Sequence, residues 1–222
     1  HGIGYNSSKD KIAIVEGFTF SWKERFLRNI WGNFYLGLEL DFQSLSRVNF
    51  KSYSNDVSLL SPTGYNGSNN FGVGLGLVYD NRHNVLNVRK GLFAETAIIN
   101  YRKGLGSIEN FSSVFTDFRF FYPIRKRNVL AIQSVGQFTL GDAPFNQYAM
   151  LGSEMMMRGY YFGRFRDKNY ISLQTEYRML PLFFAKKFGL AVFASTGMVY
   201  DKVSNITSKH LKYAGGAGVQ YL

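Results

Sequence analysis

Residues 141–170, GDAPFNQYAMLGSEMMMRGYYFGRFRDKNY, separate two stretches whose pattern predicts β-strands. A connection of this length without regular structure is uncommon in a compact domain unless it has a function. It contains Arg158-Gly159-Tyr160, then Gly163-Arg164, then the charged run Arg166-Asp167-Lys168. Cations interleaved with aromatic residues and glycine predict a loop that is folded into a polar enclosure. The rest of the chain is then expected to form the wall of that enclosure.

The sequence on both sides of this loop alternates between apolar and polar residues, which is the period of a β-strand. The alternation is clearest in 33–43, 71–79, 171–179 and 190–198. Less regular strands are expected at 17–26, 91–102, 110–122, 127–140 and 211–222. No amphipathic helix and no linker rich in proline or serine interrupts them. We therefore predict an all-β, antiparallel fold of about nine or ten strands, in a single domain over residues 1–222.

The predicted connections differ in length between the two ends of the strands. Short basic turns are expected near 27–32, 82–90, 123–127 and 180–187. Most of the connections at the opposite end are longer, and they are expected at 45–70, 103–108, 141–170 and 201–210. Short turns at one end and longer loops at the other are typical of outer-membrane β-barrels.

The alternation itself fits two architectures. In a soluble sandwich the apolar rows face a core, whereas in a membrane barrel they face lipid and the polar rows face a wet lumen. Gly72, Gly74 and Gly76 lie on a polar row and leave room inside. Tyrosine and phenylalanine, 15 and 21 residues, are abundant near strand ends, where membrane barrels carry aromatic girdles. These features favour a transmembrane β-barrel with the long loop inside its lumen.

Other classes of protein are disfavoured by composition. The net charge of +11 suggests nucleic acid, but the cations fall between apolar runs, at Arg25, Arg28, Arg82, Arg89, Lys90, 125–127, Lys186 and Lys187. We assign them to turns and predict no nucleic-acid partner. The chain has no cysteine, three scattered histidines and no Gly-x-Ser-x-Gly motif. We therefore predict no enzyme activity, no metal site and no cofactor.

Three segments resemble a known family. MRGYYFGRFRDKNY followed by ISLQTEYR, the stretch YDNRHNVLNVRKGLFAE at 79–95, and GDAPFNQYAMLG are similar to segments of the BamA/TamA superfamily of outer-membrane assembly barrels, the bacterial surface antigen family. The likeness is good over 71–222 and extends to 1–70 in pattern only. The richness in tyrosine, phenylalanine and asparagine resembles Bacteroidetes members. The resemblance implies a barrel of 16 strands, of which this chain would be a part.

The resemblance also implies a role for the loop tip. In the family the loop folds back into the lumen and an Arg-Gly-Tyr/Phe motif docks against the inner wall. The matching residues here are Arg158, Gly159 and Tyr160. A guanidinium in a confined lumen requires carboxylate or carbonyl partners, and its planar fork suits paired hydrogen bonds. Glycine allows a close backbone approach that a side chain would block.

The expected partners of Arg158 lie on the two strands after the loop. Gln174 and Glu176 are on the inward row of the first. On the second, the family usually has a Phe-x-Asp-x-Gly pattern, and Ser195 stands here at the position of the aspartate. This departure either weakens the predicted docking or leaves Glu176 as the only charge partner.

Two further groups of residues have open interpretations. The inward charges Glu39, Asp41, Glu95, Asp117 and Arg119 either hydrate the inner wall or set an ion preference. Residues 155–157, three methionines, either pack the loop against the wall or offer a soft surface for peptides.

The resemblance implies a function in inserting or translocating proteins at the bacterial outer membrane. Expected partners are outer-membrane phospholipid and lipopolysaccharide, substrate polypeptides, and accessory outer-membrane or periplasmic proteins. Two alternatives stay open. The barrel would anchor or export an N-terminal enzyme domain similar to a phospholipase or phosphatase, or it would act as a simple diffusion pore.

Overall fold

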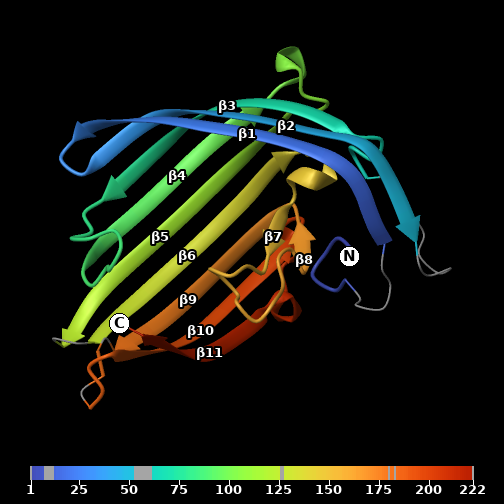
Figure 1. Ribbon diagram of the computed structural model, residues 1–222. Coiled ribbons are helices and arrows are strands. Elements are labelled where there is room, and N and C mark those ends of the chain that lie inside the picture. The colour runs from blue at the N-terminus through green and yellow to red at the C-terminus, as the bar shows by residue number, and fades with distance from the viewer. Residues whose placement is uncertain are drawn as a thin grey trace.

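The computed structural model describes residues 2–7, 13–52, 62–125, 128–179, 181–182 and 184–221. Nine strands form one antiparallel sheet (Figure 1). Their bounds are β1 Ala13–Trp31, β2 Phe34–Ser52, β3 Ser68–Asp80, β4 Gly91–Tyr101, β5 Phe111–Arg125, β6 Asn128–Gly141, β9 Asn169–Met179, β10 Phe188–Tyr200 and β11 Lys212–Tyr221. Two short strands, β7 Ala149–Leu151 and β8 Phe165–Asp167, pair with each other inside the long loop. The all-β, antiparallel prediction is confirmed.

Consecutive strands are neighbours throughout the large sheet, except that β6 pairs with β9 around the long loop. The order therefore runs from β1 to β11, and these two strands are the edge strands of the sheet. The helical elements of the described residues are four 3₁₀ turns: η1 Lys103–Leu105, η2 Phe145–Gln147, η3 Val203–Asn205 and η4 Ser208–His210. No helix in this part of the chain has the length and hydropathy needed to cross a membrane.

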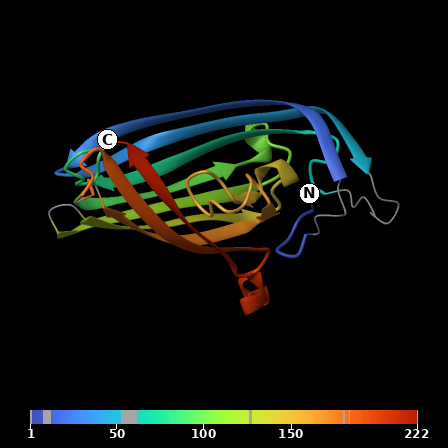
Figure 2. The same ribbon diagram turned by 60° about the horizontal axis from the view of Figure 1, so that its bottom comes forward.

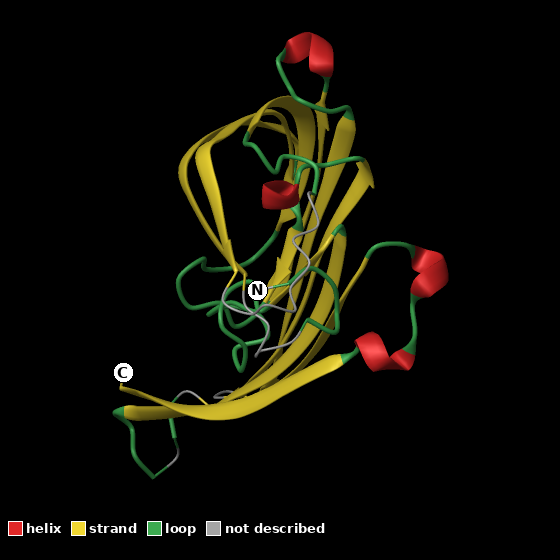
Figure 3. Ribbon diagram, turned by 90° about the vertical axis from the view of Figure 1, so that its right-hand side faces the viewer, coloured by secondary structure: helices red, strands yellow, loops and turns green. Residues whose placement is uncertain are grey.

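The sheet is strongly curved, and residues 142–168 lie against its concave side, here called the inner face (Figures 2 and 3). The convex outer face is apolar and exposed, with side chains that include Phe20, Trp22, Phe26, Leu75, Phe118, Leu173 and Val192. The inner face carries buried polar side chains that include Glu39, Asp41, Asp117, Ser172, Gln174 and Glu176. An exposed apolar surface of this extent is unusual for a soluble monomer and marks contact with a membrane or another apolar partner.

Glycine on the inner face makes room for charged side chains. A Cβ atom on Gly76 would lie 2.3 Å from the Glu39 Oε1 atom, so a side chain at this position would displace that carboxylate. Gly76 is paired with Gly37 on β2. Small residues on the inner row therefore serve to accommodate polar groups, as the alternation predicted.

The first two strands extend further than predicted. β1 and β2 have 19 residues each, and their pairing continues to Ala13 opposite Ser52. The predicted 45–70 loop is shortened accordingly, and residues 53–61 lie outside the described residues. The extension mixes polar and apolar residues on both faces, with Ile14 opposite Lys51 and Val15 opposite Phe50, and Lys51 Nζ contacts Glu16 Oε1 across the strands at 2.7 Å. Alternation cannot reveal such a segment.

The assignment of every cation to a turn is wrong for Arg25 and for Arg28, the second of which lies within β1 opposite Leu36. Because β1 continues to Trp31, Arg25 lies within the strand, opposite Glu39 of β2. Its guanidinium forms ion pairs with Glu39, 2.9 Å, and Glu95, 2.6 Å, on the inner face. The turn between β1 and β2 is restricted to Gly32 and Asn33.

Candidate functional site: the long loop on the inner face

The long loop has a packed structure of its own. It spans 142–168, close to the predicted 141–170, and its two halves meet in the β7–β8 hairpin. Gly152 has a φ of +102°, and a Cβ atom there would lie 2.4 Å from the Tyr161 carbonyl oxygen. Glycine is therefore required where the chain leaves β7.

An apolar cluster attaches this loop to the sheet. Leu151, Met157 and Phe165 of the loop pack with Tyr170 of β9 and Val199 of β10. Leu151 and Met157 are completely buried. The contact places the loop over β9 and β10, the two strands that follow it in sequence.

Methionines 155–157 divide between the two environments. Met156 and Met157 are buried, whereas Met155 is 67% exposed. Two of the three therefore pack the loop against the inner face, and the third is available at its surface.

Arg158 points from the loop to the inner face. Its Nη2 donates to Glu176 Oε2 of β9, and its guanidinium lies 3.6 Å from the ring centroid of Phe193 on β10. The Arg158 side chain is 30% exposed, and the Glu176 side chain is 9% exposed. An ion pair and a stacking contact thus act on the same group, in an arrangement that suits arginine better than lysine.

Glu176 is shared between two arginines. While Oε2 accepts from Arg158, Oε1 accepts from Arg178 Nε at 2.6 Å. Charge-assisted bonds of this kind are stronger than neutral ones, and both carboxylate oxygens are satisfied. Loss of Arg158 would therefore leave Glu176 with one remaining cation, and loss of Glu176 would leave two cations close together.

The other residues of the tip reach the last strand. A Cβ atom on Gly159 would lie 3.2 Å from the Ala214 Cβ atom of β11. The Tyr160 hydroxyl donates to the Tyr213 carbonyl oxygen, 3.2 Å, and its ring meets Phe165 edge-on. The Arg158-Gly159-Tyr160 tip thus contacts β9, β10 and β11.

The remaining predicted partners do not bind Arg158 among the described residues. Gln174 is buried on the same row as Glu176, and its Oε1 has no hydrogen-bond partner in the described part of the chain. The Ser195 hydroxyl donates instead to the Ala214 carbonyl oxygen of β11, 3.3 Å. Phe193, which the sequence reasoning did not select, supplies the stacking surface. Its place in the Phe-x-x-x-Gly segment at 193–197 was the available signal.

A second arginine fixes the loop to the N-terminal segment 2–7. Arg164 is 5% exposed, and its Nη1 and Nη2 donate to Ser7 Oγ, 2.9 Å, and to the Ser7 carbonyl oxygen, 2.8 Å. Its guanidinium also stacks over Phe165 at 4.3 Å. The Gly4 N–H donates to the Arg166 carbonyl oxygen, 2.8 Å. Arg164 and Ser7 are 157 positions apart, so no local pattern predicts this contact.

The base of the hairpin is poorly solvated. Burial raises the pKa of Asp167, although its Oδ1 accepts the Lys168 N–H at 2.8 Å. Burial likewise lowers the pKa of Arg166. Both shifts follow from the burial of these two side chains, which disfavours their charged forms.

The predicted inward charges are paired with one another and with cations of the inner face. Arg119 binds Asp117 at 2.5 Å, and Lys23 approaches Asp41 at 3.2 Å. The Tyr101 hydroxyl donates to Asp41 Oδ2 at 2.8 Å. Paired charges of both signs give a hydrophilic wall without an accumulation of one sign. No set of three or more His, Cys, Asp or Glu side chains in the described ranges could hold a metal ion.

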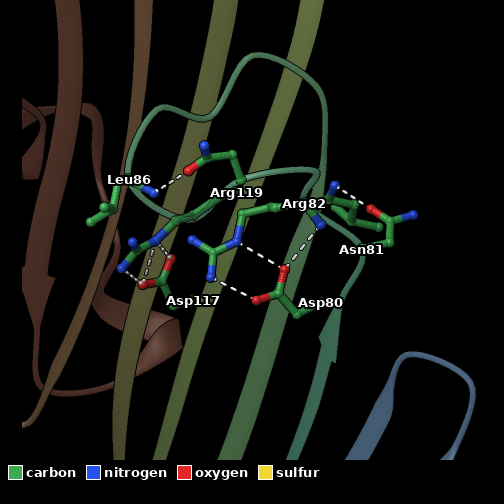
Figure 4. Close-up of polar contacts among 8 residues, drawn as sticks. Asp80, Asn81, Arg82, Leu86, Asp117 and Arg119 are labelled. Atoms are coloured by element: carbon green, nitrogen blue, oxygen red, sulfur yellow. Dashed lines mark hydrogen bonds and ion pairs between the residues drawn. The ribbon is translucent and has the colours of Figure 1, made fainter.

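The turn between β3 and β4 is also built onto the inner face (Figure 4). Arg82 makes two side-chain bonds to Asp80, 2.9 and 2.7 Å, and stacks over Phe93 at 4.6 Å. Val88 is buried with Phe121 of β5 and a pair of β6 side chains. The turn is therefore held to the neighbouring strands.

The chain was compared with known protein families and structures. The sequence profile of the family described as the Omp85 superfamily domain matches residues 6–222. The crystal structure of BamA from Haemophilus ducreyi lacking POTRA domains 1–3 superposes with a TM-score of 0.68 at 16% sequence identity. The match covers 91% of this chain and 48% of that one, so this chain spans about half the length of the solved relative. Comparison with curated proteins gives no match.

Proposed function

We propose, because this chain belongs to the Omp85 superfamily, that it forms part of an outer-membrane β-barrel of a bacterium and acts in inserting or translocating polypeptides there. The observation that carries the proposal is the docked loop: a loop with an Arg-Gly-Tyr tip lies on the polar face of a curved sheet whose other face is apolar. BamA from Haemophilus ducreyi has the same fold over most of this chain.

The outer face supports placement in a membrane. Its exposed apolar side chains would lie in water if the sheet were soluble, at a cost of about 25 cal/mol for each Å². In hydrocarbon the backbone groups of a strand need partners on both sides, and closed barrels supply them. We propose that further strands complete a barrel of 16, with the loop in its lumen and phospholipid and lipopolysaccharide around it.

The proposed mechanism is physical. A polypeptide that crosses or enters hydrocarbon exposes unpaired backbone groups, each costing several kcal/mol. A polar inner face, or a seam between strands, lowers that cost. In this proposal Arg158 holds the loop in its inward position, and release of the Glu176 contact lets the loop move when a substrate or an accessory protein binds.

The proposal is tested with the protein of full natural length in lipid vesicles. An unfolded outer-membrane barrel protein is added, and its folding is followed by the mobility shift of folded barrels on unheated gels. We expect faster folding than in empty vesicles, and slower folding with Arg158→Ala than with the unchanged protein. Equal rates with and without the protein would contradict the assembly function. A steady ion conductance together with equal rates would favour the diffusion pore.

A further inference from the structure

The short-turn end of the sheet carries a strong excess of positive charge. By sequence, this end comprises the four short connections and the strand residues beside them, at 28–34, 80–91, 123–128 and 180–188. They contain nine Lys or Arg and one Asp. The segments at the opposite end are 1–16, 46–68, 102–110, 142–168 and 201–212, and these contain 13 Lys or Arg and eight Asp or Glu. Cations exceed carboxylates by eight over the short-turn segments and by five over the much longer segments of the opposite end, so positive charge is denser at the short-turn end.

The cations of the short-turn end are available for a partner. Five of them are exposed and form no ion pair with a carboxylate of the residues that the structure describes: Arg28, Lys90, Arg125, Lys186 and Lys187. The one carboxylate at this end, Asp80, is occupied by Arg82 at 2.7 Å. A cluster without internal counterions attracts anions from its surroundings.

An aromatic belt borders these cations. Trp31 stacks on Phe34 at 6.2 Å between centroids, and Phe34 meets Tyr79 at 4.8 Å. Phe188 and Tyr221 meet at 5.6 Å on the far strands. Trp31 is 77% exposed. Aromatic side chains of this kind lie at the level of lipid headgroups, where one part of the ring is wet and another apolar.

Arg28 joins the apolar surface to this belt. In the β1–β2 register it is opposite Leu36, and two residues earlier Phe26 is opposite Leu38. It therefore continues the outer, apolar row of β1 as that row reaches the short turn. A long cationic side chain at this position can lay its stem on hydrocarbon and place its charge among headgroups.

Lys90 is held in place by the hairpin base. The His83 N–H donates to the Lys90 carbonyl oxygen, 3.3 Å, and the Leu92 N–H donates to Asn81 Oδ1, 2.6 Å. The Arg82–Asp80 pair stabilises the same turn (Figure 4). A cation on a fixed turn loses less conformational entropy when it binds an anion.

We propose that the short-turn end binds a membrane leaflet rich in anionic phospholipid, whose phosphates contact the exposed cations while the aromatic belt lies among the headgroups. The inference rests on the proposed membrane insertion and adds the lipid class and the end of the molecule that selects it. Each Lys or Arg near an anionic surface strengthens binding severalfold, and salt weakens the effect.

The two tryptophans, Trp22 and Trp31, supply a direct test. Trp22→Phe leaves Trp31 in the belt, and Trp31→Phe leaves Trp22, which lies on the outer face opposite Phe42. Each variant is made in the protein of full natural length, with any tryptophan outside residues 1–222 replaced by phenylalanine. It is refolded into phosphatidylcholine vesicles that contain brominated phosphatidylcholine or brominated phosphatidylglycerol, and fluorescence quenching is measured. We expect Trp31 to be quenched severalfold more effectively by the brominated anionic lipid at low salt, with a loss of this preference at high salt. Trp22 should be quenched similarly by both lipids.

Charge variants complete the test. Arg28→Gln with Lys90→Gln should remove most of the severalfold preference at Trp31, leaving quenching by the two lipids close to equal. The matched control, Lys202→Gln with Lys209→Gln, removes two exposed cations from the long-loop end and should leave the preference unchanged. Equal quenching of Trp31 by both lipids at low salt would overturn this inference, and would leave the cations for an acidic polypeptide. Absence of quenching of Trp22 by any brominated lipid would instead contradict membrane insertion itself.

Discussion

At the scale of single residues, the central feature is the environment of the Arg158 guanidinium. One side of the group meets the Glu176 carboxylate, and its face meets the Phe193 ring. A planar, permanently charged group fits both contacts at once, whereas an ammonium group fits the charge alone. Replacing Arg158 by lysine therefore keeps the positive charge but loses the planar shape, which separates the two contributions.

Arg158→Ala should release the loop tip, and Arg158→Lys should do so partially. The chain contains no cysteine, so a single Met157→Cys, at a completely buried position, reports on opening of the loop through its rate of thiol labelling. Breaking one partner of a buried ion pair costs about 3 kcal/mol, which this partly exposed arginine reduces. We expect labelling to accelerate roughly tenfold in the Arg158→Ala background.

Met155→Cys is the control for that experiment, because Met155 is already 67% exposed. Its labelling rate should be fast and unaffected by Arg158→Ala. Slow labelling of Met157→Cys in both backgrounds would show that Arg158 does not hold the loop.

Gly159 tests the close approach to β11. In Gly159→Ala the new methyl group would lie 3.2 Å from the Ala214 Cβ atom, a few tenths of an ångström closer than ordinary contact. We expect a loss of about 1 kcal/mol in the stability of the docked tip, measured as faster labelling of Met157→Cys. Adding Ala214→Gly should restore the slow rate. A failure of this rescue would show that the clash lies elsewhere.

At the scale of elements, the long loop is held at two separate points. Arg158 attaches its tip to β9 and β10, and Arg164 attaches the return strand β8 to segment 2–7. The first contact joins the loop to the strands that follow it, with 18 positions between Arg158 and Glu176, and the second joins Arg164 to Ser7, 157 positions away. The two can therefore be disrupted independently.

Arg164→Gln should free segment 2–7 while the loop tip stays docked. The expected result is faster hydrogen exchange of the Gly4 amide, whose acceptor is the Arg166 carbonyl oxygen, with little change in the labelling of Met157→Cys. Ser7→Ala, which removes one of the two acceptors of Arg164, should have a smaller effect in the same direction. Unchanged hydrogen exchange at the Gly4 amide would show that Arg164 does not hold segment 2–7 against the loop.

The elements also show what sequence can predict. The strand pattern could be read because the outer row must be apolar and the inner row polar, with a period of two. The far ends of β1 and β2 could not, because polar and apolar residues are mixed on both of their faces, as in the pairs Ile14 with Lys51 and Val15 with Phe50. Arg158 could be selected from the Arg-Gly-Tyr motif, and Glu176 from the inward row of the strand that follows the loop. Phe193 stands in the Phe-x-x-x-Gly segment, but that segment does not indicate which of its residues stacks on the arginine. Ser7 could not be selected, because an acceptor distant in sequence leaves no periodic trace.

At the scale of the whole molecule, three surfaces with different chemistry belong to one curved sheet. The outer face is apolar, the inner face carries paired charges and the loop, and the short-turn end is strongly cationic. This division matches what hydrocarbon, a wet lumen and an anionic leaflet each require of a protein surface. The charge of +11, which suggested nucleic acid, has its strongest local excess at one end of the sheet.

The most direct test of the central claim is a disulfide between the loop tip and the last strand. Gly159→Cys with Ala214→Cys places the two Cβ atoms within a few tenths of an ångström of the separation that a disulfide needs. In the membrane-inserted protein we predict spontaneous cross-linking, seen as a mobility shift on a non-reducing gel, and a much lower yield with Arg158→Ala. Gly159→Cys with Ala217→Cys is the control, because Ala217 pairs with Val192 on the outer face. Absence of the first cross-link, or equal yields from both pairs, would contradict a loop docked on the inner face.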